Sequence, residues 1–452
     1  MSLPEQFINS LESNFGKPVA DAFLDSLDTE AVTAVRRNVS KISSDDFEKH
    51  FSCASPETVP WCGEGLYLNE RPDFTLDPWL HAGCYYVQDA SSMAVCEAFK
   101  SVSQEMGGSL RVLDLCAAPG GKTTALASML SGSDLLVANE VIRSRVTILA
   151  ENMTKWGRAN VVVTNNEASD FASLSSYFDI VLADVPCSGE GMFRKDDKAI
   201  DEWSVDNVKL CASRQRKIIA DVWGALREGG FMIYSTCTFN VHENDENVQW
   251  IENELGAEVV RIPFYDGEGA PIQTSKGYQF IPGITRGEGF FFAVLRKISP
   301  SAGFRKPKGK QFRAGSRVKC EWVKGGYETL SVKTSSEELI KAYPANIMDE
   351  ISLIESSLRS VRSGVAVALV KGRDFIPEPA LALSEVLADN AFRRVQLSLK
   401  EALNYLKLQP LTLKEVEKGF VLVDYYGAPL GFLKNLGNRT NNLFPSAWRI
   451  RK

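Results

Sequence analysis

The chain has 452 residues, more than one hydrophobic core usually holds, since single cores stop growing at about 250–300 residues. Hydrophobic residues make up 44% of it and charged residues 24%, the balance of an ordinary globular protein. The net charge of −6 argues against a simple nucleic-acid binder, for which a basic domain is the usual footprint.

Neither a targeting segment nor a metal-binding pattern is evident. The N-terminus has no basic stretch followed by an apolar run, and no run of about 18 apolar residues occurs, so we expect no secretory signal and no membrane span. Nine cysteines occur without a CxxC pair or other metal-ligand spacing, which indicates reduced thiols in the cytoplasm and no metal. Because histidines number only three, cysteine, aspartate and lysine are favoured as the reacting groups.

The first 80 residues read as a small mixed module with helices over 4–15 and 20–27. From residue 110 strands and helices alternate, which predicts a mostly parallel sheet covered by helices on both faces, within a main domain of residues 81–298. The strands are expected over 110–115, 134–139, 161–164, 180–183, 231–235 and 289–295, and the helices over 123–130, 143–156, 208–226 and 244–254. The aromatic triplet at 290–292 lies in an apolar strand and is expected in the core.

A glycine-rich turn follows the first strand of this sheet. Gly120 and Gly121 let the backbone approach a ligand, and the helix begins directly after them. The segment is neither GxGxxG nor GxxxxGK[ST], which disfavours dinucleotides and triphosphates. Glu140 ends the next strand, where an acid can bind ribose hydroxyls. Together these features predict an adenosyl ligand.

Two cysteines close neighbouring strands of the predicted sheet. Cys187 follows the fourth strand in the segment Asp-Val-Pro-Cys at 184–187, and Cys237 follows the fifth in Ser-Thr-Cys-Thr at 235–238. A single cysteine is more often a small buried apolar residue than a catalyst. Two at adjacent strand ends predict cysteine-dependent methyl transfer to a pyrimidine ring.

The C-terminal third divides into three predicted parts: a basic linker over 299–315, an intermediate domain over 316–385 and a compact tail domain over 386–452. The tail is expected to hold a helix at 399–406 and strands at 420–423 and 429–433. No acid occurs between Glu288 and Glu321 or after Asp424, while basic residues accumulate in both stretches. These stretches read either as solvated chain or as contacts to an RNA backbone.

The runs 114–123, 184–195 and 235–238 resemble the Nop/Sun family of RNA cytosine-5 methyltransferases, and most closely its bacterial small-subunit ribosomal RNA branch. The segment 85–93 is similar to the one that precedes that family's catalytic domain. The tail from residue 407 to 449 is similar to a PUA-like domain. The resemblance implies an α/β fold: a Rossmann-like S-adenosylmethionine-dependent methyltransferase sheet with a small N-terminal module and C-terminal α+β and PUA-like RNA-binding domains.

By this resemblance Cys237 is the nucleophile that adds to C6 of cytosine, Cys187 assists release of the product, Asp184 binds the base, and Lys122 helps to form the thiolate. The residues implied in binding S-adenosylmethionine are Cys116, Ala117, Ala118, Pro119, Gly120, Gly121, Lys122, Glu140, Arg145, Glu167 and Asp184. Glu167 stands where the family commonly has Asp, and Arg145 reads equally well as part of a solvated helix face. Arg194 and Lys195 are expected to meet substrate phosphate.

The expected substrate is 16S ribosomal RNA, free or in the small subunit, with the target base flipped out or single-stranded. Transfer RNA is the alternative substrate, and a non-catalytic ribosome-assembly factor is the alternative role. A DNA cytosine-5 methyltransferase would use Cys187 alone, so Cys237 and the tail speak against it. An amino-group methyltransferase would carry Asp/Asn-Pro-Pro-Tyr where this chain has Asp-Val-Pro-Cys.

Overall fold

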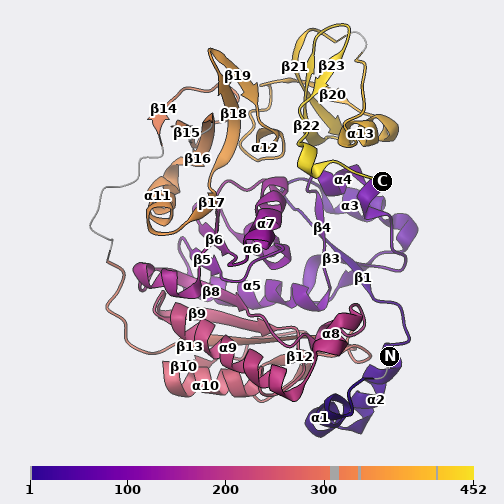
Figure 1. Cartoon of the computed structure of the whole chain (residues 1–452), viewed down its shortest axis with the longest axis vertical. Coiled ribbons are helices and arrows are strands. Elements are labelled where there is room, and N and C mark those ends of the chain that lie inside the picture. The colour runs from indigo at the N-terminus through magenta and orange to yellow at the C-terminus, as the bar shows by residue number, and fades with distance from the viewer. Residues whose placement is uncertain (1–2, 306–314, 334–336, 414–415) are drawn as a thin grey trace.

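The computed structural model describes residues 3–305, 315–333, 337–413 and 416–452. Within these residues the chain forms four β-sheets, of which one ten-stranded sheet runs through the middle of the molecule (Figure 1). The N-terminal helices and a small sheet flank it, and the two C-terminal sheets lie together at one end of the molecule (Figure 1).

Five parallel strands in the order β9-β8-β5-β6-β7 form the centre of the large sheet. These strands are β5 (Arg111–Asp114), β6 (Leu135–Asn139), β7 (Val161–Thr164), β8 (Phe178–Asp184) and β9 (Leu226–Thr236). Since β6 and β8 lie on opposite sides of β5, the chain reverses direction across the sheet between β5 and β8. Such a switch point is where α/β sheets bind ligands, because the loops after the two strands diverge there.

Antiparallel strands complete both edges of the large sheet: β13 pairs with β9, and β17 pairs with β7. The added strands are β10 (Ala257–Val259), β11 (Ile272–Gln273), β12 (Tyr278–Phe280), β13 (Phe290–Lys297) and β17 (Ser360–Arg362). The triplet Phe290, Phe291 and Phe292 is buried as predicted, with the first and third side chains on one face of the sheet and the second on the other.

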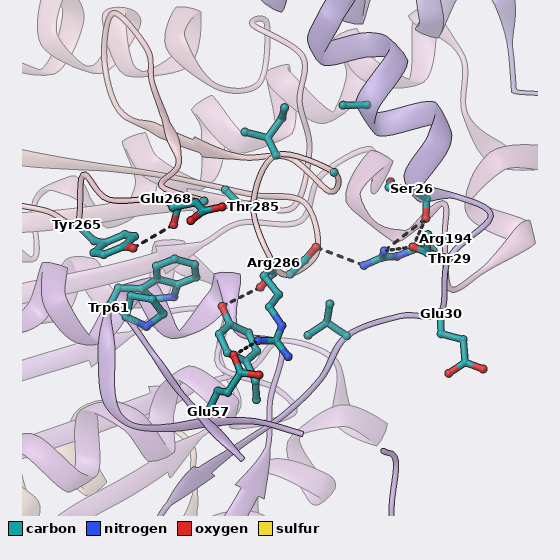
Figure 2. A pocket seen from close by; sticks show the side chains of 18 of the residues that line it. Ser26, Thr29, Glu30, Glu57, Trp61, Arg194, Tyr265, Glu268, Thr285 and Arg286 are labelled. Atoms are coloured by element: carbon teal, nitrogen blue, oxygen red, sulfur yellow. Dashed lines mark hydrogen bonds and ion pairs between the residues drawn. The ribbon is translucent and has the colours of Figure 1, made fainter. Parts of the chain in front are cut away.

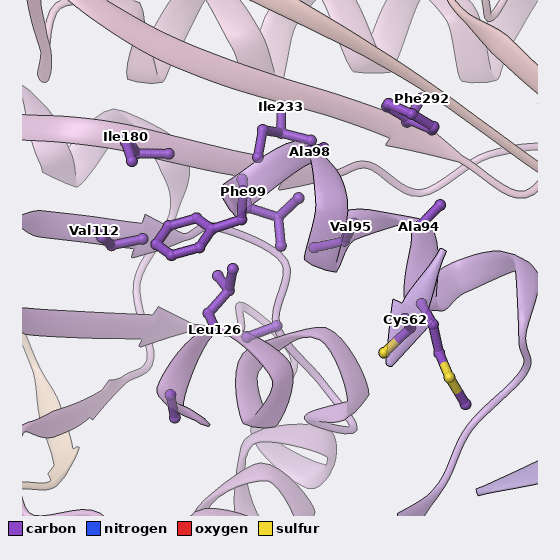
Figure 3. Close-up of a cluster of buried hydrophobic side chains, with 14 of the residues drawn as sticks. Cys62, Ala94, Val95, Ala98, Phe99, Val112, Leu126, Ile180, Ile233 and Phe292 are labelled. Carbon is purple, nitrogen blue, oxygen red and sulfur yellow. The ribbon is translucent and has the colours of Figure 1, made fainter. Parts of the chain in front are cut away.

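Helices cover both faces of the sheet, as the alternation predicted. Figure 3 shows one face, where Phe99 and Leu126 pack against Val112, Ile180 and Ile233 of the strands. The helices on this face are α5 (Val95–Met106), α6 (Gly121–Met129) and α7 (Arg143–Trp156). On the other face lie α9 (Val205–Trp223), α10 (Asp245–Leu255) and α11 (Met348–Ser357). The short helix α8 (Asp197–Glu202) precedes α9.

The N-terminal module contains two predicted helices, and a sheet that the sequence patterns did not predict. The helices α1 (Glu5–Phe15) and α2 (Lys17–Ser26) place Phe7 and Phe23 against Phe193 and Phe239 of the large domain. The sheet has the order β2-β3-β1-β4. Its elements are β1 (Thr33–Arg37), α3 (Ser44–His50), β2 (Glu57–Val59), β3 (Cys62–Leu68), α4 (Pro78–His81) and β4 (Tyr85–Val87).

The C-terminal part folds into two sheets in the orders β14-β15-β16-β18-β19 and β20-β21-β22-β23. The first contains β14 (Ser316–Arg317), β15 (Tyr327–Lys333), β16 (Glu338–Pro344), β18 (Val365–Lys371) and β19 (Asp374–Pro377), followed by α12 (Pro379–Ala382). The second contains β20 (Arg393–Gln396), α13 (Leu399–Leu406), β21 (Gly419–Tyr425), β22 (Ala428–Asn435) and β23 (Thr440–Asn442). The helix and both strands predicted for the tail are among them.

The sheets cross the predicted domain boundaries in two places, and the boundaries themselves stay predictions. Tyr85–Val87 pairs with β1 of the N-terminal sheet, and Ser360–Arg362 of the intermediate segment joins the large sheet. Most of the basic side chains predicted for the linker, which are Lys306, Lys308, Lys310 and Arg313, lie outside the described residues.

Candidate active site

The glycine-rich turn lies at the carboxyl end of β5, between β6 and β8. Gly120 has φ of +117°, and a Cβ there would lie 3.3 Å from side-chain atoms of both Leu149 and Met153 in α7. Two side chains of α7 fasten the turn: Arg145 Nη2 donates to the Ala118 carbonyl (2.7 Å) and Asn152 Nδ2 to the Pro119 carbonyl (2.8 Å). The turn is therefore held close to α7, and only glycine fits its tightest point.

The two cysteines meet at the neighbouring strand ends, as their positions predicted. Cys187 Sγ lies 2.9 Å from Cys237 Sγ, and the Cys237 amide donates to Cys187 Sγ at 3.3 Å. Both thiols are free. The hydrogen bond to Cys237 and burial raise the pKa of Cys187 well above its ordinary value. Cys187 therefore keeps its proton and can donate it in a hydrogen bond to the sulfur of Cys237.

A close backbone approach fixes the Cys237 loop. The Gly191 amide donates to the Cys237 carbonyl at 2.8 Å. A Cβ on Gly191 would lie 2.7 Å from that same carbonyl oxygen and 2.8 Å from Gly289 Cα, so a side chain at Gly191 would force the loop to move. The absence of a side chain here is a steric requirement of the loop.

Two buried carboxylates surround the same loop. Glu190 accepts from the amides of Phe239 (2.7 Å) and Asn240 (3.0 Å) and from Trp203 Nε1 (2.9 Å). Glu243 accepts from the Ser188 amide at 3.0 Å, beside Cys187, and burial raises its pKa. Glu243 directly precedes the helix predicted over 244–254, whereas nothing in the sequence singled out Glu190.

Lys122 and Asp184 form an ion pair next to the cysteines. Lys122 Nζ lies 2.8 Å from Asp184 Oδ2, and Ser235 Oγ donates to Asp184 Oδ1 at 2.7 Å. Burial by itself would lower the pKa of Lys122, but Asp184, together with the nearby Cys237 and Asp114, outweighs that effect and raises it. Lys122 therefore keeps its positive charge close to Cys237.

Asp114 at the end of β5 is 1% exposed and only partly satisfied. Thr123 Oγ1 donates to its Oδ2 at 2.7 Å, whereas its Oδ1 is buried with no hydrogen-bond partner. Burial raises the pKa of Asp114 to about 7. An orphaned carboxylate oxygen under a glycine-rich turn is typical of a ligand site.

Glu140 ends β6 as predicted, and its carboxylate is almost completely buried. Glu140 Oε1 accepts from the Ile142 amide at 2.9 Å, and Oε2 lies 3.4 Å from Arg145 Nη1. Val141 and Ile142, which directly follow it, are 46% and 47% exposed, unusual values for such side chains. The sequence patterns did not identify this apolar pair as part of the site. Its position directly after Glu140 could have indicated it.

The predicted contact Glu167 is an exposed residue that begins a short 3-10 helix, Ala168–Leu174. Its side chain accepts from the backbone amide of Asp170, and the Asp170 carboxylate accepts from the Glu167 amide at 3.0 Å. In this structure Glu167 therefore acts as a helix cap.

Arg36 of β1 reaches the glycine-rich turn from the N-terminal module. Its Nη2 donates to the Gly121 carbonyl at 3.1 Å and to Thr124 Oγ1, its Nε donates to Gln88 Oε1 at 2.9 Å, and the residue is 1% exposed. No pattern in the sequence pointed to Arg36, since an arginine in a short polar strand normally indicates a solvated position.

Arg194, expected to meet phosphate, is instead mostly engaged within the protein. Its Nη2 lies 2.8 Å from Glu288 Oε1, and Lys195 Nζ lies 3.2 Å from the same oxygen. Figure 2 shows Arg194 turned toward Ser26 and Thr29 of the N-terminal module, at the rim of a cavity of about 910 Å³. The cavity contains none of the cysteine or glycine-rich-turn residues.

Among the described residues no group of three or more His, Cys, Asp or Glu side chains is placed to hold a metal ion. In the same part of the chain, no helix is both long and apolar enough to cross a membrane.

Comparison with known proteins gives three matching family models. The model described as 16S rRNA methyltransferase RsmB/F matches residues 104–296, the N-terminal domain of 16S rRNA methyltransferase RsmF matches 3–90, and the methyltransferase RsmF PUA domain matches 392–450. The ribosomal RNA small subunit methyltransferase F of Shewanella loihica is 32% identical over 98% of this chain and 95% of its own length. That of Pectobacterium carotovorum is 30% identical over the same shares.

Solved structures agree on the fold. A methyltransferase homolog from Pyrococcus horikoshii has a TM-score of 0.56 and 27% identity, covering 65% of this chain and 95% of that one. NSun6 from the same organism, solved with SFG, has a TM-score of 0.56 and 21% identity, covering 66% and 99%. The predicted α/β fold with a PUA-like tail is confirmed. The chain belongs to the RsmB/F family of 16S ribosomal RNA methyltransferases, in its methyltransferase F branch, and is an RNA methyltransferase.

Proposed function

We propose that the chain is an S-adenosylmethionine-dependent cytosine-C5 methyltransferase that makes 5-methylcytosine in 16S ribosomal RNA, acting in the cytoplasm. The main support for the proposal is the distance of 2.9 Å between Cys187 Sγ and Cys237 Sγ, beside the glycine-rich turn. Two thiols in contact, one of which retains its proton, suit a reaction in which one sulfur must both attack and leave a pyrimidine ring.

The residues around the turn fit S-adenosylmethionine. The turn Cys116–Gly121 would pass close to the ligand, Glu140 would accept from the ribose hydroxyls, and Val141 and Ile142 offer apolar surface for the adenine. The orphaned Asp114 Oδ1 is suited to a cationic group. When bound, this cofactor supplies an electrophilic methyl group on a sulfonium. Arg145 acts in this proposal by holding both Glu140 and the Ala118 carbonyl.

Glu167 and Asp184 complete the proposed cofactor contacts. Asp184 lies between the turn and the cysteines through its pair with Lys122, so it can serve both the cofactor and the base. Glu167 reaches the adenine only if its capping interaction with Asp170 opens.

In the proposed reaction Cys237 attacks C6 of cytosine as a thiolate, which turns C5 into a nucleophile for the methyl group. Lys122 favours the thiolate by its charge, and the pair of Lys122 and Asp184 places the Asp184 carboxylate to accept from the exocyclic amine of the base. After methyl transfer a water molecule takes the C5 proton to solvent. The electron pair of the C5–H bond then forms the C5–C6 double bond, and the bond from C6 to Cys237 breaks with its electrons going to the sulfur. Cys187 assists this release because its thiol hydrogen-bonds the departing thiolate.

The base must leave its helix or be single-stranded to present C5 and C6 to these residues. Ribosomal RNA is proposed as the substrate because the relatives that match nearly the whole chain are named for the small ribosomal subunit.

Bisulfite sequencing tests the proposal directly. Unmodified small-subunit RNA is incubated with the protein and S-adenosylmethionine, with Cys237→Ala as the control variant. Cytosines that become resistant with the native protein only would establish both the C5 chemistry and the target. If no cytosine becomes resistant in ribosomal RNA but one does in transfer RNA, the chemistry stands and the substrate is wrong. Methyl transfer to any other atom would refute the cysteine mechanism.

A further inference from the structure

A two-residue hairpin turn joins β21 and β22 in the C-terminal sheet. Tyr425 pairs with Ala428, and both residues between them have positive φ, +46° at Tyr426 and +79° at Gly427. Such a turn favours Asn-Gly, because a bulky side chain at its first position is strained. Tyr426 is thus a residue that the local backbone disfavours, and strain of this kind points to a role for the side chain.

The Tyr426 side chain is also unusually exposed. At 69% it is the most exposed of the large hydrophobic side chains in the described part of the chain, and the one aromatic among those that are exposed. Its ring meets Tyr425 edge-on, with centroids 4.8 Å apart. A tyrosine that is both strained and exposed contributes little to folding, so its ring is available to a ligand.

Tyr425 and Tyr426 separate two hollows of about 610 and 470 Å³. Across the larger hollow stands a second aromatic wall, where the His50 ring stacks on Trp79 with centroids 4.3 Å apart. Trp79 Nε1 donates to the Tyr425 carbonyl at 3.2 Å, which ties the two walls together. The hollow is therefore lined by aromatic residues of the N-terminal helices α3 and α4 and of the hairpin in the C-terminal sheet.

Polar and cationic groups line the same hollow, together with the Asp46 carboxylate, and the His50 ring is paired with Asp77 at 2.7 Å. The Gln396 amide is exposed, and Lys49 is exposed and takes part in no ion pair with another described residue. Lys41 lies deeper, where its ammonium donates to the carbonyls of Ala82 and Lys155, and burial lowers its pKa to about 8. Aromatic faces with amide and ammonium groups at the rim are the features that bind nucleobases and their phosphates.

The two walls rest on one shared hydrophobic core. Phe47, Trp79 and Tyr85 of the N-terminal module share a hydrophobic core with Tyr405 and Leu430 of the C-terminal sheet. The helices α3 and α4 lie against this sheet in Figure 1. A site between them is preorganised, because neither wall has to move to meet the other.

We propose that Tyr426, Tyr425 and the His50–Trp79 pair bind an unpaired nucleobase of the RNA substrate, outside the methylation site. Tyr426 stacks on the base, and Lys49 contacts an adjacent phosphate. The proposal depends on the chain being an RNA methyltransferase, and not on the cysteine mechanism or on the identity of the target base.

The test exploits the backbone of the turn. Tyr426→Asn removes the ring but supplies the residue that this turn favours, so the variant is expected to unfold at the same temperature as the native protein or higher. Tyr426→Phe keeps the ring and serves as the matched control. Binding of the full-length proteins to transcribed 16S ribosomal RNA is measured without a methyl donor, over a series of salt concentrations, so that the cysteine chemistry cannot affect the result.

Loss of one stacked base predicts binding about 5- to 150-fold weaker for Tyr426→Asn and near-native binding for Tyr426→Phe. The slope of log Kd against log salt should stay native in Tyr426→Asn, because stacking releases no counterions. Lys49→Gln should reduce that slope by about 1. Native binding by Tyr426→Asn, or equal loss in Tyr426→Phe, would overturn the proposal. A loss seen only with intact small subunits, and not with the transcript, would mean that a ribosomal protein occupies the hollow and would also overturn it.

Discussion

The guanidinium of Arg36 in the N-terminal sheet donates a hydrogen bond to the carbonyl of Gly121 in the glycine-rich turn, at 3.1 Å. The two residues lie 85 positions apart, so this bond joins the N-terminal module to the turn that we assign to the cofactor. Arg36 also packs over the Trp156 ring at the end of α7, 5.0 Å from its centroid. The module is thereby part of the scaffold of the turn.

Arg36→Met is expected to destabilise the protein by about 2–4 kcal/mol, because it leaves the buried Gln88 Oε1 without its donor and leaves Thr124 Oγ1 as the one side-chain donor to the Gly121 carbonyl among the described residues. It should also raise the KM for S-adenosylmethionine more than it lowers kcat, since the turn loses a support and the cysteines do not. Urea denaturation and steady-state kinetics measure the two effects. Arg143→Met, at an exposed position of α7, is the control and should change stability by less than about 0.5 kcal/mol. Equal behaviour of the two variants would contradict the role given to Arg36.

The contact between Cys187 and Cys237 predicts opposite outcomes for their alanine variants. Cys237→Ala should lose methyl transfer and form no covalent RNA adduct, because the attacking sulfur is gone. Cys187→Ala should still attack but release slowly, with turnover about 10²- to 10⁴-fold lower, the range of a lost acid–base group. Denaturing gel electrophoresis with labelled RNA detects the adduct, which should accumulate only in Cys187→Ala. Two fully active variants would refute the two-thiol mechanism.

The cysteine pair could be predicted from the sequence and the Arg36 contact could not, for physical reasons. Strands that alternate with helices place their carboxyl ends at one edge of a sheet, so Cys187 and Cys237 had to come near each other. Burial of Arg36 depends on Gln88, which directly follows β4, and on Thr124 of α6, and no local pattern encodes these contacts. The same limit applies to β9, which begins at Leu226 and runs through Gly229 and Gly230, whereas the predicted strand covers only 231–235.

Glu190→Gln is expected to slow adduct formation and to destabilise the Cys237 loop. The carboxylate accepts from the amides of Phe239 and Asn240 and from Trp203, and an amide NH₂ group in place of one oxygen would face donors. Each lost bond to a charged group costs about 1.5–3 kcal/mol. Rates of adduct formation in a Cys187→Ala background measure the effect. Glu202→Gln, at an exposed position of α8, should leave the rate unchanged.

Asp114 should make the stability of the large sheet fall as pH rises toward neutrality. In the unfolded chain an aspartate ionises near its ordinary pKa of 3.8, whereas the folded protein keeps the Asp114 proton until about pH 7. Between these values the native state binds the extra proton, so the carboxyl destabilises folding by about 1.4 kcal/mol for each pH unit.

Asp114→Asn removes this proton while its amide oxygen can still accept from Thr123. The free energy of unfolding of Asp114→Asn, relative to native protein, should therefore rise by about that amount per unit from pH 5 to 7 in urea titrations. Above pH 7 the difference should level off, because both states are then ionised. A difference that stays constant from pH 5 to 8 would mean that Asp114 is already charged in the native protein at pH 5, and that its unpartnered Oδ1 is stabilised by a cation or solvent at the base of the glycine-rich turn.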